Sequence, residues 1–387
     1  MSSDAEKVIE RIEETLLTYC RQQGLFKSGD RVIAACSGGA DSMALLLFLL
    51  RRRRDLEIEV LATHVNHGIR GMQALADANF VTAFCRKNGV ELFLYDAVRE
   101  GVQIPQQPSE EWARGLRYGW FEKLAVQEEA FIATAHTMSD QVETVLFRMA
   151  RGTGVHGLAG IPPRRGYYVR PCLCLTRADT EAYCAALGQN YVQDETNAQN
   201  EYARNRIRHD AVPALQYANP AAETAIARLC RQMRDLDQWL SGEAAALLQA
   251  ASVEGGYEVS VLRRAEGPVL DAALHSLVSP VRDAEEKYIT LLRFLLQRGE
   301  GALQLTPEVT YKVKNDFFRP AGRHVRKTLK KYYNELAIPQ EERSLLPLLA
   351  DGSEVLWLWG CGFAEGVAPD AFTNEVLMVR TEKAGEA

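Results

Sequence analysis

Short apolar runs alternate with amphipathic segments over the first 150 residues of the chain. Runs with the length and composition of a buried strand occupy residues 32–36, 58–65, 90–95 and 130–135. Helical patterns lie around and between them, at residues 5–24, 43–50, 74–89, 111–129 and 139–151. Because strands and helices alternate, the pattern predicts an α/β fold with a doubly wound parallel sheet.

The pattern changes after residue 212. Helical periodicity dominates residues 221–248, 268–277 and 284–297, which predicts a second, helical domain. Short strands at residues 303–305, 355–359 and 375–379 accompany a basic segment and predict a small third α/β domain. We therefore expect a catalytic domain at residues 1–215, a helical domain at residues 216–300 and a C-terminal domain at residues 301–387.

Composition adds limits to this picture. A chain of 387 residues with 47% hydrophobic and 25% charged residues has the profile of a globular protein of two or three domains. It has no apolar run of about 18 residues, so we expect no membrane helix, and residues 1–10 do not resemble a secretory signal. The 8 cysteines form no C-x-x-C pair, which favours a reduced, cytoplasmic protein.

Charge narrows the possible partners. A net charge of −6 argues against a protein that coats nucleic acid indiscriminately, but it leaves room for a selective RNA enzyme with local basic patches. Such patches occur at residues 51–54, 204–209 and 323–331. For each patch the alternative interpretation is a solvated surface.

The most informative motif is SGGADS at residues 37–42, directly after the first predicted strand. Its glycines permit backbone angles closed to other residues, and the helix that follows offers unpaired N–H groups and a positive dipole end. The motif therefore predicts a phosphate cradle. It is neither a Walker loop nor G-x-G-x-x-G, and the alternative is a glycine turn that serves packing alone.

A second cluster follows the fourth predicted strand. His136, Asp140 and Glu143 are spaced by four and three residues, so we expect them on one exposed face of a helix. The residues expected on the opposite, buried side are Val142, Val145, Leu146 and Met149. Two acids and an imidazole suit a divalent cation on nucleotide phosphates, or an amine substrate. The alternative is helix capping, with Ser139 as the N-cap.

These motifs share one topological position. The phosphate cradle, residues 64–70 and residues 136–143 each follow a predicted parallel strand. Ligands of such sheets bind outside the carboxyl ends of the strands. We therefore expect one shared site.

Several motifs in order resemble one enzyme family. SGGADS is similar to the pyrophosphate loop, or PP-loop, of ATP pyrophosphatases, which split ATP between its α- and β-phosphates. HVNHGIR, WARGLRY, AHTMSDQVET and RGTGVHGLAG follow at residues 64–70, 112–118, 135–144 and 151–160. Together they resemble the tRNA(Ile)-lysidine synthetases. The likeness is strong over residues 5–215 and weak over residues 305–365.

The resemblance implies a fold and a reaction. The fold is a Rossmann-like sheet of the adenine nucleotide alpha hydrolase type. The reaction uses ATP, with Mg²⁺, to adenylate the C2 oxygen of the first anticodon cytidine in an isoleucine tRNA that carries CAU. The ε-amine of L-lysine then displaces AMP and gives lysidine. The resemblance is also compatible with a homodimer.

The resemblance also implies roles for residues. The nucleotide would be held by Ser37, Gly38, Gly39, Ala40, Asp41, Ser42 and His64. The catalytic residues would be Asp41, Arg114, His136, Asp140 and Glu143, with Asp41 and Asp140 as metal ligands. Arg114 or Arg117 would stabilise the leaving pyrophosphate. The residues expected to contact tRNA are Arg117, Arg204, Asn205, Arg208, Lys327 and Lys330.

The basic residues have alternatives of their own. The segment around Arg204, Asn205 and Arg208 resembles a loop that meets the anticodon, and its alternative is a loop tied down by ion pairs. Lys327 and Lys330 are expected on one side of a helix that begins near residue 323, and a solubilising surface is their alternative.

The chain departs from the family at the acid helix. The usual pattern is H-H-x-D-D-Q, whereas Thr137 replaces the second histidine and Ser139 the first aspartate. This leaves the geometry for metal and lysine open. Two other functions compete with this one: a 2-thiolation enzyme with a PP-loop, which the missing cysteine pair disfavours, and an ATP-binding protein without catalysis.

Overall fold

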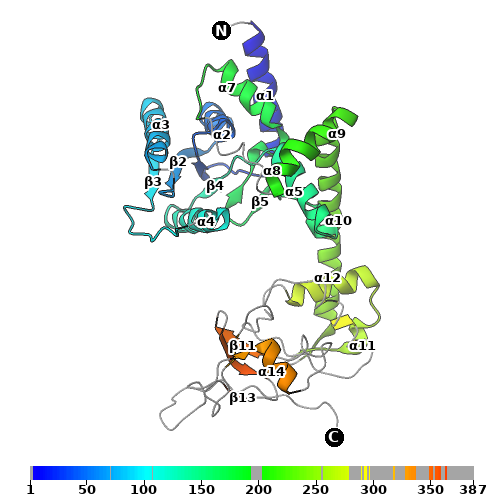
Figure 1. Cartoon of the computed structure of the whole chain (residues 1–387). Helices are drawn as coiled ribbons and strands as arrows, with labels where there is room; N and C mark the ends of the chain where they lie inside the picture. Colours follow the sequence, from blue (N-terminus) through cyan, green and yellow to red (C-terminus); the bar gives the residue numbers. More distant parts are fainter. Residues whose placement is uncertain are drawn as a thin grey trace. The chain divides into compact units, whose positions relative to one another are not determined.

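The computed structural model divides into two compact units, Met1–Asp237 and Gln238–Ala387. The parts of the chain that it describes are residues 3–69, 71–106, 108–192, 203–253, 256–278, 289, 292–293, 296, 317–318, 327–336, 348–351, 354–358 and 362–363. Figure 1 shows both units, coloured along the sequence. The predicted division into three domains stays a prediction.

A six-stranded sheet forms the centre of the first unit. Its order is β3-β2-β1-β4-β6-β5. The strands are β1 (Arg31–Ala35), β2 (Glu59–Asn66), β3 (Leu92–Asp96), β4 (Phe131–Ala133), β5 (Arg164–Arg165) and β6 (Tyr168–Val169). All neighbours from β3 to β6 are parallel, and only β5 runs antiparallel at the edge. The predicted parallel sheet is confirmed, with its order reversing between β1 and β4, where such folds bind ligands.

Helices flank this sheet at the positions that the pattern predicts. They are α1 (Ser3–Gln22), α2 (Ala40–Arg52), α3 (Met72–Asn88), α4 (Glu110–Gln127) and α5 (Met138–Ala150). Helix α2 begins three residues earlier than its apolar run, because residues 40–42 belong to its first turn. A short α6 (Val155–Leu158), the 3-10 helix η1 (Pro171–Cys174) and α7 (Arg177–Ala186) complete this part of the chain.

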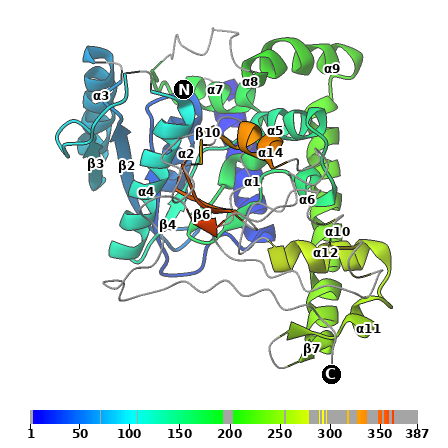
Figure 2. The same cartoon turned by 60° about the horizontal axis from the view of Figure 1, so that its bottom comes forward.

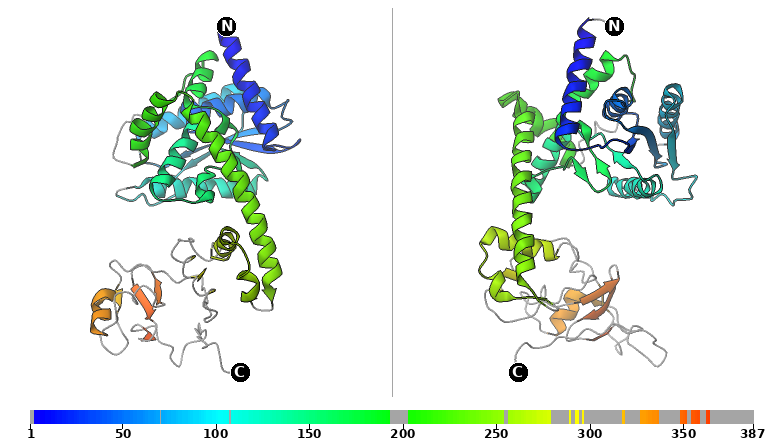
Figure 3. Two further views of the ribbon diagram at one scale, coloured as in Figure 1. Left: turned by 90° about the vertical axis from the view of Figure 1, so that its right-hand side faces the viewer. Right: turned by 180° about the vertical axis from the view of Figure 1, so that it is seen from behind.

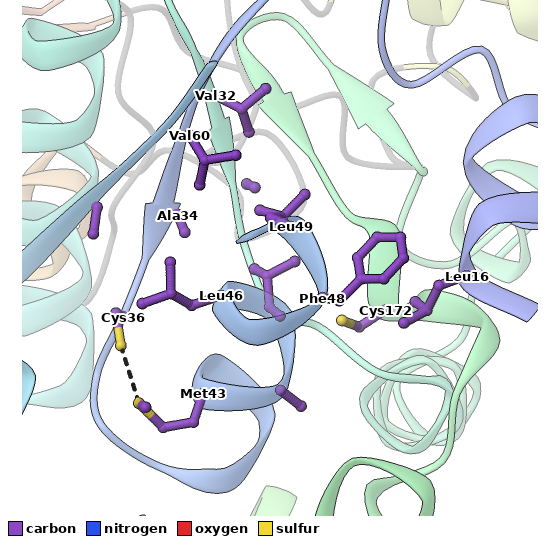
Figure 4. Close-up of a cluster of buried hydrophobic side chains, with 14 of the residues drawn as sticks. Leu16, Val32, Ala34, Cys36, Met43, Leu46, Phe48, Leu49, Val60 and Cys172 are labelled. Atoms are coloured by element: carbon purple, nitrogen blue, oxygen red, sulfur yellow. Dashed lines mark hydrogen bonds between the residues drawn. The ribbon is translucent and has the colours of Figure 1, made fainter. Parts of the chain in front are cut away.

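Both faces of the sheet are covered by apolar packing. On one face Val32, Ala34 and Val60 pack with Leu46, Phe48 and Leu49 of α2 in a cluster that includes side chains of α1 and α7 (Figure 4). On the other face Ile33, Leu61 and Ile132 pack with Phe121 and Leu124 of α4. This alternation along β1 gives the strand two buried faces, which explains its unbroken apolar run.

A buried carboxylate joins three helices on the first face. Glu13 of α1 is 1% exposed and accepts hydrogen bonds from Arg51, from Arg52 Nε at 2.6 Å and from Tyr183 OH at 2.7 Å. A buried acid needs such partners. Two arginines of the predicted basic patch at residues 51–54 are therefore engaged in a structural ion pair with the helix α1.

The segment after residue 202 is helical and irregular. Helix α8 (Ala203–Arg206) continues into a π-helical turn, η3 (Ile207–Ala211), and then into α9 (Val212–Ala218). Figure 2 shows α8 and α9 beside each other above α5. The long helix α10 (Ala222–Ala251) follows, as Figure 3 shows. It confirms the helix predicted at residues 221–248.

The second unit contains helices and a small sheet. Helices α11 (Val259–Leu262) and α12 (Gly267–Val278) and the hairpin of β7 (Ser252–Val253) and β8 (Gly256–Tyr257) come first. The sheet has the order β10-β9-β12-β11, with β13 paired to β12. Its strands are β9 (Phe317–Phe318), β10 (Lys327–Thr328), β11 (Leu348–Asp351), β12 (Glu354–Leu358) and β13 (Gly362–Phe363).

Several predictions concern this unit. The helix at residues 268–277 and the strand at residues 355–359 are confirmed as α12 and β12. The helix predicted at residues 284–297 lies mostly, and the strands at residues 303–305 and 375–379 lie entirely, outside the described residues. The basic helix from residue 323 is wrong, because Lys327 lies on β10 and Lys330 lies on α14 (Leu329–Glu335).

Candidate nucleotide and substrate site

A cavity of about 590 Å³ opens where β1, β2 and β4 end. Predicted site residues that line it are Ser37, Asp41, Ser42, His64, Arg114, Arg117, His136 and Asp140. They come from the loop after β1, the first turn of α2, β2, α4, the segment after β4 and the start of α5. The structure thus brings the three predicted motifs to one cavity, at the switch point of the sheet.

Ser42 shapes the loop between β1 and α2. Its Oγ accepts hydrogen bonds from the backbone N–H groups of Ser37 at 3.2 Å and Gly38 at 3.1 Å, and it donates to Gly39 O at 2.9 Å. Gly39 is the N-cap of α2 and provides no side-chain cap. The helix start therefore keeps its positive dipole end toward a ligand, with Ala40 and Asp41 in its first turn.

Gly38 is required by both conformation and space. Its φ is +94°, a region that L-residues rarely adopt. A Cβ at this position would lie 3.2 Å from Val192 Cγ2, and the Gly38 carbonyl also accepts the Val192 N–H at 2.9 Å. The turn therefore packs tightly against residue 192.

Asp41 faces the cavity from the first turn of α2. Thr180 Oγ1 donates a hydrogen bond to Asp41 Oδ1, and Arg177 Nε lies 3.5 Å from Asp41 Oδ2. Burial raises the pKa of Asp41, and the Thr180 hydrogen bond and the Arg177 charge oppose this rise only in part. Asp41 thus points into the site with partners on α7.

Asp140 is fixed by a capping box at the start of α5. Thr137 is the N-cap, and Asp140 Oδ2 accepts from Thr137 N at 2.8 Å and from Thr137 Oγ1 at 2.9 Å. The prediction of Ser139 as the N-cap is wrong, because the helix begins one residue earlier, at Met138. Burial favours a higher pKa for Asp140, but the Thr137 amide and the Arg177 charge outweigh it and lower that pKa.

Glu143 is not on an exposed face, contrary to the prediction. It is 1% exposed and forms a bidentate ion pair with Arg208, at 2.6 Å to Nε and 3.0 Å to Nη2. Val142 and Val145 are buried as predicted, whereas Met149 is 54% exposed. The first turns of α5 are covered because η1, α8 and η3 pack against this helix, which periodicity within one helix cannot show.

A smaller pocket of about 190 Å³ adjoins Glu143. Its charged lining residues are Glu143, Arg177, Arg208 and Glu223. Arg208 reaches it from the π-helical turn η3, and such turns often occur at functional sites. The pocket therefore offers charges of both signs beside the acids of α5.

Arg177 is the residue that the sequence patterns missed. Its guanidinium lies 3.5 Å from Asp41, 3.3 Å from Asp140 and 3.5 Å from Glu143. It is the first residue of α7, after the N-cap Thr176. A signal was present, because Thr176 and Asp179 form a capping box that marks a helix start, but nothing in the sequence links this helix to α5.

Two histidines of the site are held by specific hydrogen bonds. His64 Nδ1 lies 2.8 Å from Cys36 O, and the ring is 5% exposed. His136 Nδ1 lies 2.9 Å from Thr134 Oγ1. Each bond orients its ring at the carboxyl end of a strand, β2 for His64 and β4 for His136.

The arginines of α4 lie on another wall of the cavity. Arg114 is exposed, donates to Tyr118 OH at 3.2 Å and stacks 4.4 Å from the centre of the Tyr118 ring. Arg117 is half-buried, and burial lowers its pKa. Among the described residues its Nε has no hydrogen-bond partner. Both can meet an anion in the cavity.

The remaining predicted residues lie outside this cavity. Arg204 and Asn205 are on α8, and Lys327 and Lys330 are in the second unit. Asp77 of α3, which no motif singled out, is 6% exposed and lines the cavity. Its position in the middle of a helix gives no sequence signal.

Asp41 and Asp140 are suited to a cation that also binds the phosphate oxygens of a ligand. The described residues contain no group of three or more His, Cys, Asp or Glu side chains arranged to hold a metal. Mg²⁺, however, commonly takes one or two carboxylates together with phosphate oxygens. Asp41 and Asp140 meet this need, because both contact the same guanidinium and both line the cavity. In the described part of the chain, no helix has both the length and the apolar character to span a bilayer.

Comparison with known proteins identifies two matching regions. A PP-loop domain family matches residues 5–215, and a TilS substrate C-terminal domain family matches residues 308–378. The tRNA(Ile)-lysidine synthase of Bacteroides thetaiotaomicron is 38% identical over 58% of this chain and 52% of its own length. Those of Clostridium perfringens and Dehalococcoides mccartyi are 32% identical over 75% and 64%, and 26% identical over 95% and 98%, of the two chains.

These matches differ in how much of each relative's length the chain covers. The chain covers less than two thirds of the length of the first two relatives, although it aligns with nearly all of the third. The PP-loop match alone covers more than half of the chain and includes the whole cavity at the ends of β1, β2 and β4. The chain therefore belongs to the PP-loop family.

Proposed function

We propose that this protein ligates L-lysine to C2 of the first anticodon cytidine in an isoleucine tRNA with the anticodon CAU. ATP first adenylates the C2 oxygen and releases pyrophosphate, and the lysine ε-amine then displaces AMP. The observation that carries the proposal is the cavity that joins the loop at residues 37–42 to Asp140 and His136. Relatives named tRNA(Ile)-lysidine synthase and the TilS substrate C-terminal domain match support the substrate.

The loop and the arginines of α4 would hold the nucleotide. The first turn of α2 is suited to phosphate because its N-terminus carries the positive dipole end. Arg117, partly desolvated on the opposite wall, would gain a strong charge-assisted hydrogen bond from a phosphate. We assign Arg114 and Arg117 to the pyrophosphate that leaves, and His64 to the adenylate.

Asp41 and Asp140 would hold a Mg²⁺ ion. When bound, this ion would neutralise phosphate charge as it develops. The chain itself contributes the orientation of the two acids. Thr180 fixes Asp41, and the capping box of Thr137 fixes Asp140.

The smaller pocket is suited to free lysine. Arg177 and Arg208 can bind a carboxylate, while Glu143 and Glu223 can bind an ammonium group. Asp140 and His136 lie toward the larger cavity, where the ε-amine must arrive and lose a proton as the bond to C2 forms and the C2–O bond to AMP breaks. Charges of both signs therefore favour an amino acid over a simple amine.

AMP release tests the proposal directly. With ATP and Mg²⁺ we expect repeated release of AMP and pyrophosphate only when both the CAU-bearing isoleucine tRNA and lysine are present. Asp41→Asn should lower this rate by at least about 100-fold, as is usual for loss of a transition-state contact. ADP as the product, or normal turnover by Asp41→Asn, would contradict the proposal.

A further inference from the structure

One guanidinium holds together the three acids of the site. Arg177 uses a different nitrogen for each: Nε for Asp41, Nη2 for Asp140 and Nη1 for Glu143, at 3.3–3.5 Å. Asp41 belongs to α2, whereas Asp140 and Glu143 belong to α5. The single side chain of α7 therefore joins carboxylates from two other helices.

The backbone of Arg177 is also fixed against α5. Its N–H donates to Ser139 Oγ at 3.1 Å, and its side chain is 30% exposed. Ser139 is one of the two residues at which the chain departs from the usual family pattern. A neutral hydroxyl at this position can accept the amide without adding a fourth negative charge to the cluster.

The charges show what Arg177 does there. Glu143 has a closer partner in Arg208, at 2.6 Å. In the part of the chain that the structure describes, Asp41 forms its ion pair with Arg177 alone, and Asp140 has Arg208 only at 4.0 Å. Arg177 is thus the main counter-ion of the two acids assigned to the metal.

We propose that Arg177 is a positioning residue. Its guanidinium occupies the place of the divalent cation between Asp41 and Asp140 and leaves that place when nucleotide and metal bind. The inference rests on the proposed function, which supplies the metal ligands. The guanidinium and a Mg²⁺ ion would both need the carboxylates of Asp41 and Asp140, and two cations held by the same acids would repel each other. The guanidinium of Arg177 lies 3.5 Å from Asp41 and 3.3 Å from Asp140, which is longer than a strong charge-assisted hydrogen bond, so a metal ion can displace it. Arg208 keeps Glu143 in place during this exchange.

Binding of Mn²⁺ to the nucleotide-free protein tests this proposal. Loss of the free-ion signal in electron paramagnetic resonance measures binding in the wild type, Arg177→Met, Arg177→Lys and Arg11→Met. Arg11 is the matched control, because it also pairs with an acid of α7, Asp179, at 2.9 Å. Removing a unit charge near the ion should strengthen Mn²⁺ binding by about tenfold or more in Arg177→Met. Arg177→Lys, which keeps the charge, and Arg11→Met should bind like the wild type.

A second readout separates positioning from folding. MgCl₂ without nucleotide should raise the Tm of Arg177→Met by several degrees more than that of the wild type, because the ion replaces the lost charge. Adding Asp41→Asn to Arg177→Met should abolish this gain. Equal Mn²⁺ affinity and equal Mg²⁺ response in the wild type and Arg177→Met would overturn the proposal.

The outcomes also distinguish this inference from the proposed function. If the wild type forms AMP with tRNA and lysine while Arg177→Met gains no metal affinity, only the role of Arg177 is wrong. If Arg177→Met gains affinity as expected but the wild type forms no AMP, the proposed reaction is wrong and the exchange of cations stands.

Discussion

At the scale of single residues, the loop between β1 and α2 depends on Ser42 and Gly38. Ser42 Oγ organises the turn through three hydrogen bonds to its backbone, so the turn keeps its shape without a ligand. Gly38 permits the approach of residue 192. A preformed turn reduces the ordering that nucleotide binding requires.

Replacing Gly38 tests this account. Gly38→Ala should destabilise the protein by about 1–3 kcal/mol, through the positive φ and the contact with Val192, and should weaken ATP binding. Gly29→Ala is the matched control, because Gly29 has φ +85° but nothing within 4 Å of its Cβ position. Denaturant unfolding and nucleotide titration of both variants measure the two effects. An equal loss of ATP affinity in both would show that the turn at Gly38 has no special role.

Cys36 gives a second prediction at this scale. The thiol is 2% exposed, and burial raises its pKa to about 11. Only about one thiol in a thousand is then ionised at pH 8, and only the thiolate reacts. We expect iodoacetamide to label Cys36 far more slowly in the folded protein than in urea, as peptide mass analysis would show. Rapid labelling of the folded protein would contradict the packing of Cys36 against Met43 (Figure 4).

At the scale of elements, the acids are positioned by helix starts. Asp140 is at once a member of the capping box of α5 and a site residue, and Arg177 opens α7. Helix ends carry unpaired backbone groups, so their caps are both stabilising and precisely placed. The site is therefore built from the starts of α2, α5 and α7.

Removing the cap of α5 should affect both stability and function. Thr137→Val should cost about 0.5–2 kcal/mol, the usual loss for a cap, and should also weaken metal-dependent ATP binding, because Asp140 loses its hydrogen bond from Thr137 Oγ1 at 2.9 Å. Ser109→Ala, which removes the cap of α4, provides the comparison. If the two variants lose similar stability and neither changes ATP binding, Thr137 acts on the helix alone.

The elements themselves were largely predictable. Four apolar runs predicted the strands β1 to β4, and the stripes between them predicted the helices. The runs of β1, β2 and β4 are unbroken because these strands are covered on both faces, whereas the edge strand β3 leaves Leu94 50% exposed. The short strands β5 and β6 were not predicted, since strands of two residues leave no periodic pattern. The cavity was predictable because the motif at residues 37–42, residues 64–70 and residues 136–143 each follow a predicted parallel strand.

The partners of the acids were not predictable. Arg177 is 34 residues beyond Glu143, and the contact depends on where the first residue of α7 lies relative to α5. The burial of Glu143 has the same origin. Arg208 was expected to contact tRNA because its segment resembles a loop that meets the anticodon. The π-helical turn directs it to Glu143, which agrees with the alternative of a loop held by ion pairs. Local spacing shows which residues share a face, whereas such partners depend on tertiary packing.

At the scale of the whole molecule, binding of RNA is expected to involve the second unit. The TilS substrate C-terminal domain match covers residues 308–378, which include Lys327, Lys330 and Lys331. Lys331 is exposed on α14. Although the chain carries a net charge of −6, these three lysines lie within five residues of one another in the sequence, so we expect them to act as a local basic group toward phosphates.

Replacing these three lysines with alanine should weaken tRNA binding without changing ATP binding. Each lost phosphate contact should flatten the dependence of log K on log salt by about 0.7–0.9, because fewer counterions are released. Filter binding at several salt concentrations measures the slope. An unchanged slope would assign the lysines to a solubilising surface.

We propose that the cavity at the ends of β1, β2 and β4 uses ATP to join lysine to an anticodon cytidine. Mass analysis of nucleosides from a CAU-bearing isoleucine tRNA transcript, incubated with the protein, ATP, Mg²⁺ and lysine, tests it most directly. We expect one cytidine to be converted to lysidine, with no product when lysine is omitted or when Asp41→Asn replaces the wild type. An unmodified cytidine after incubation with folded protein that binds ATP would contradict this proposal.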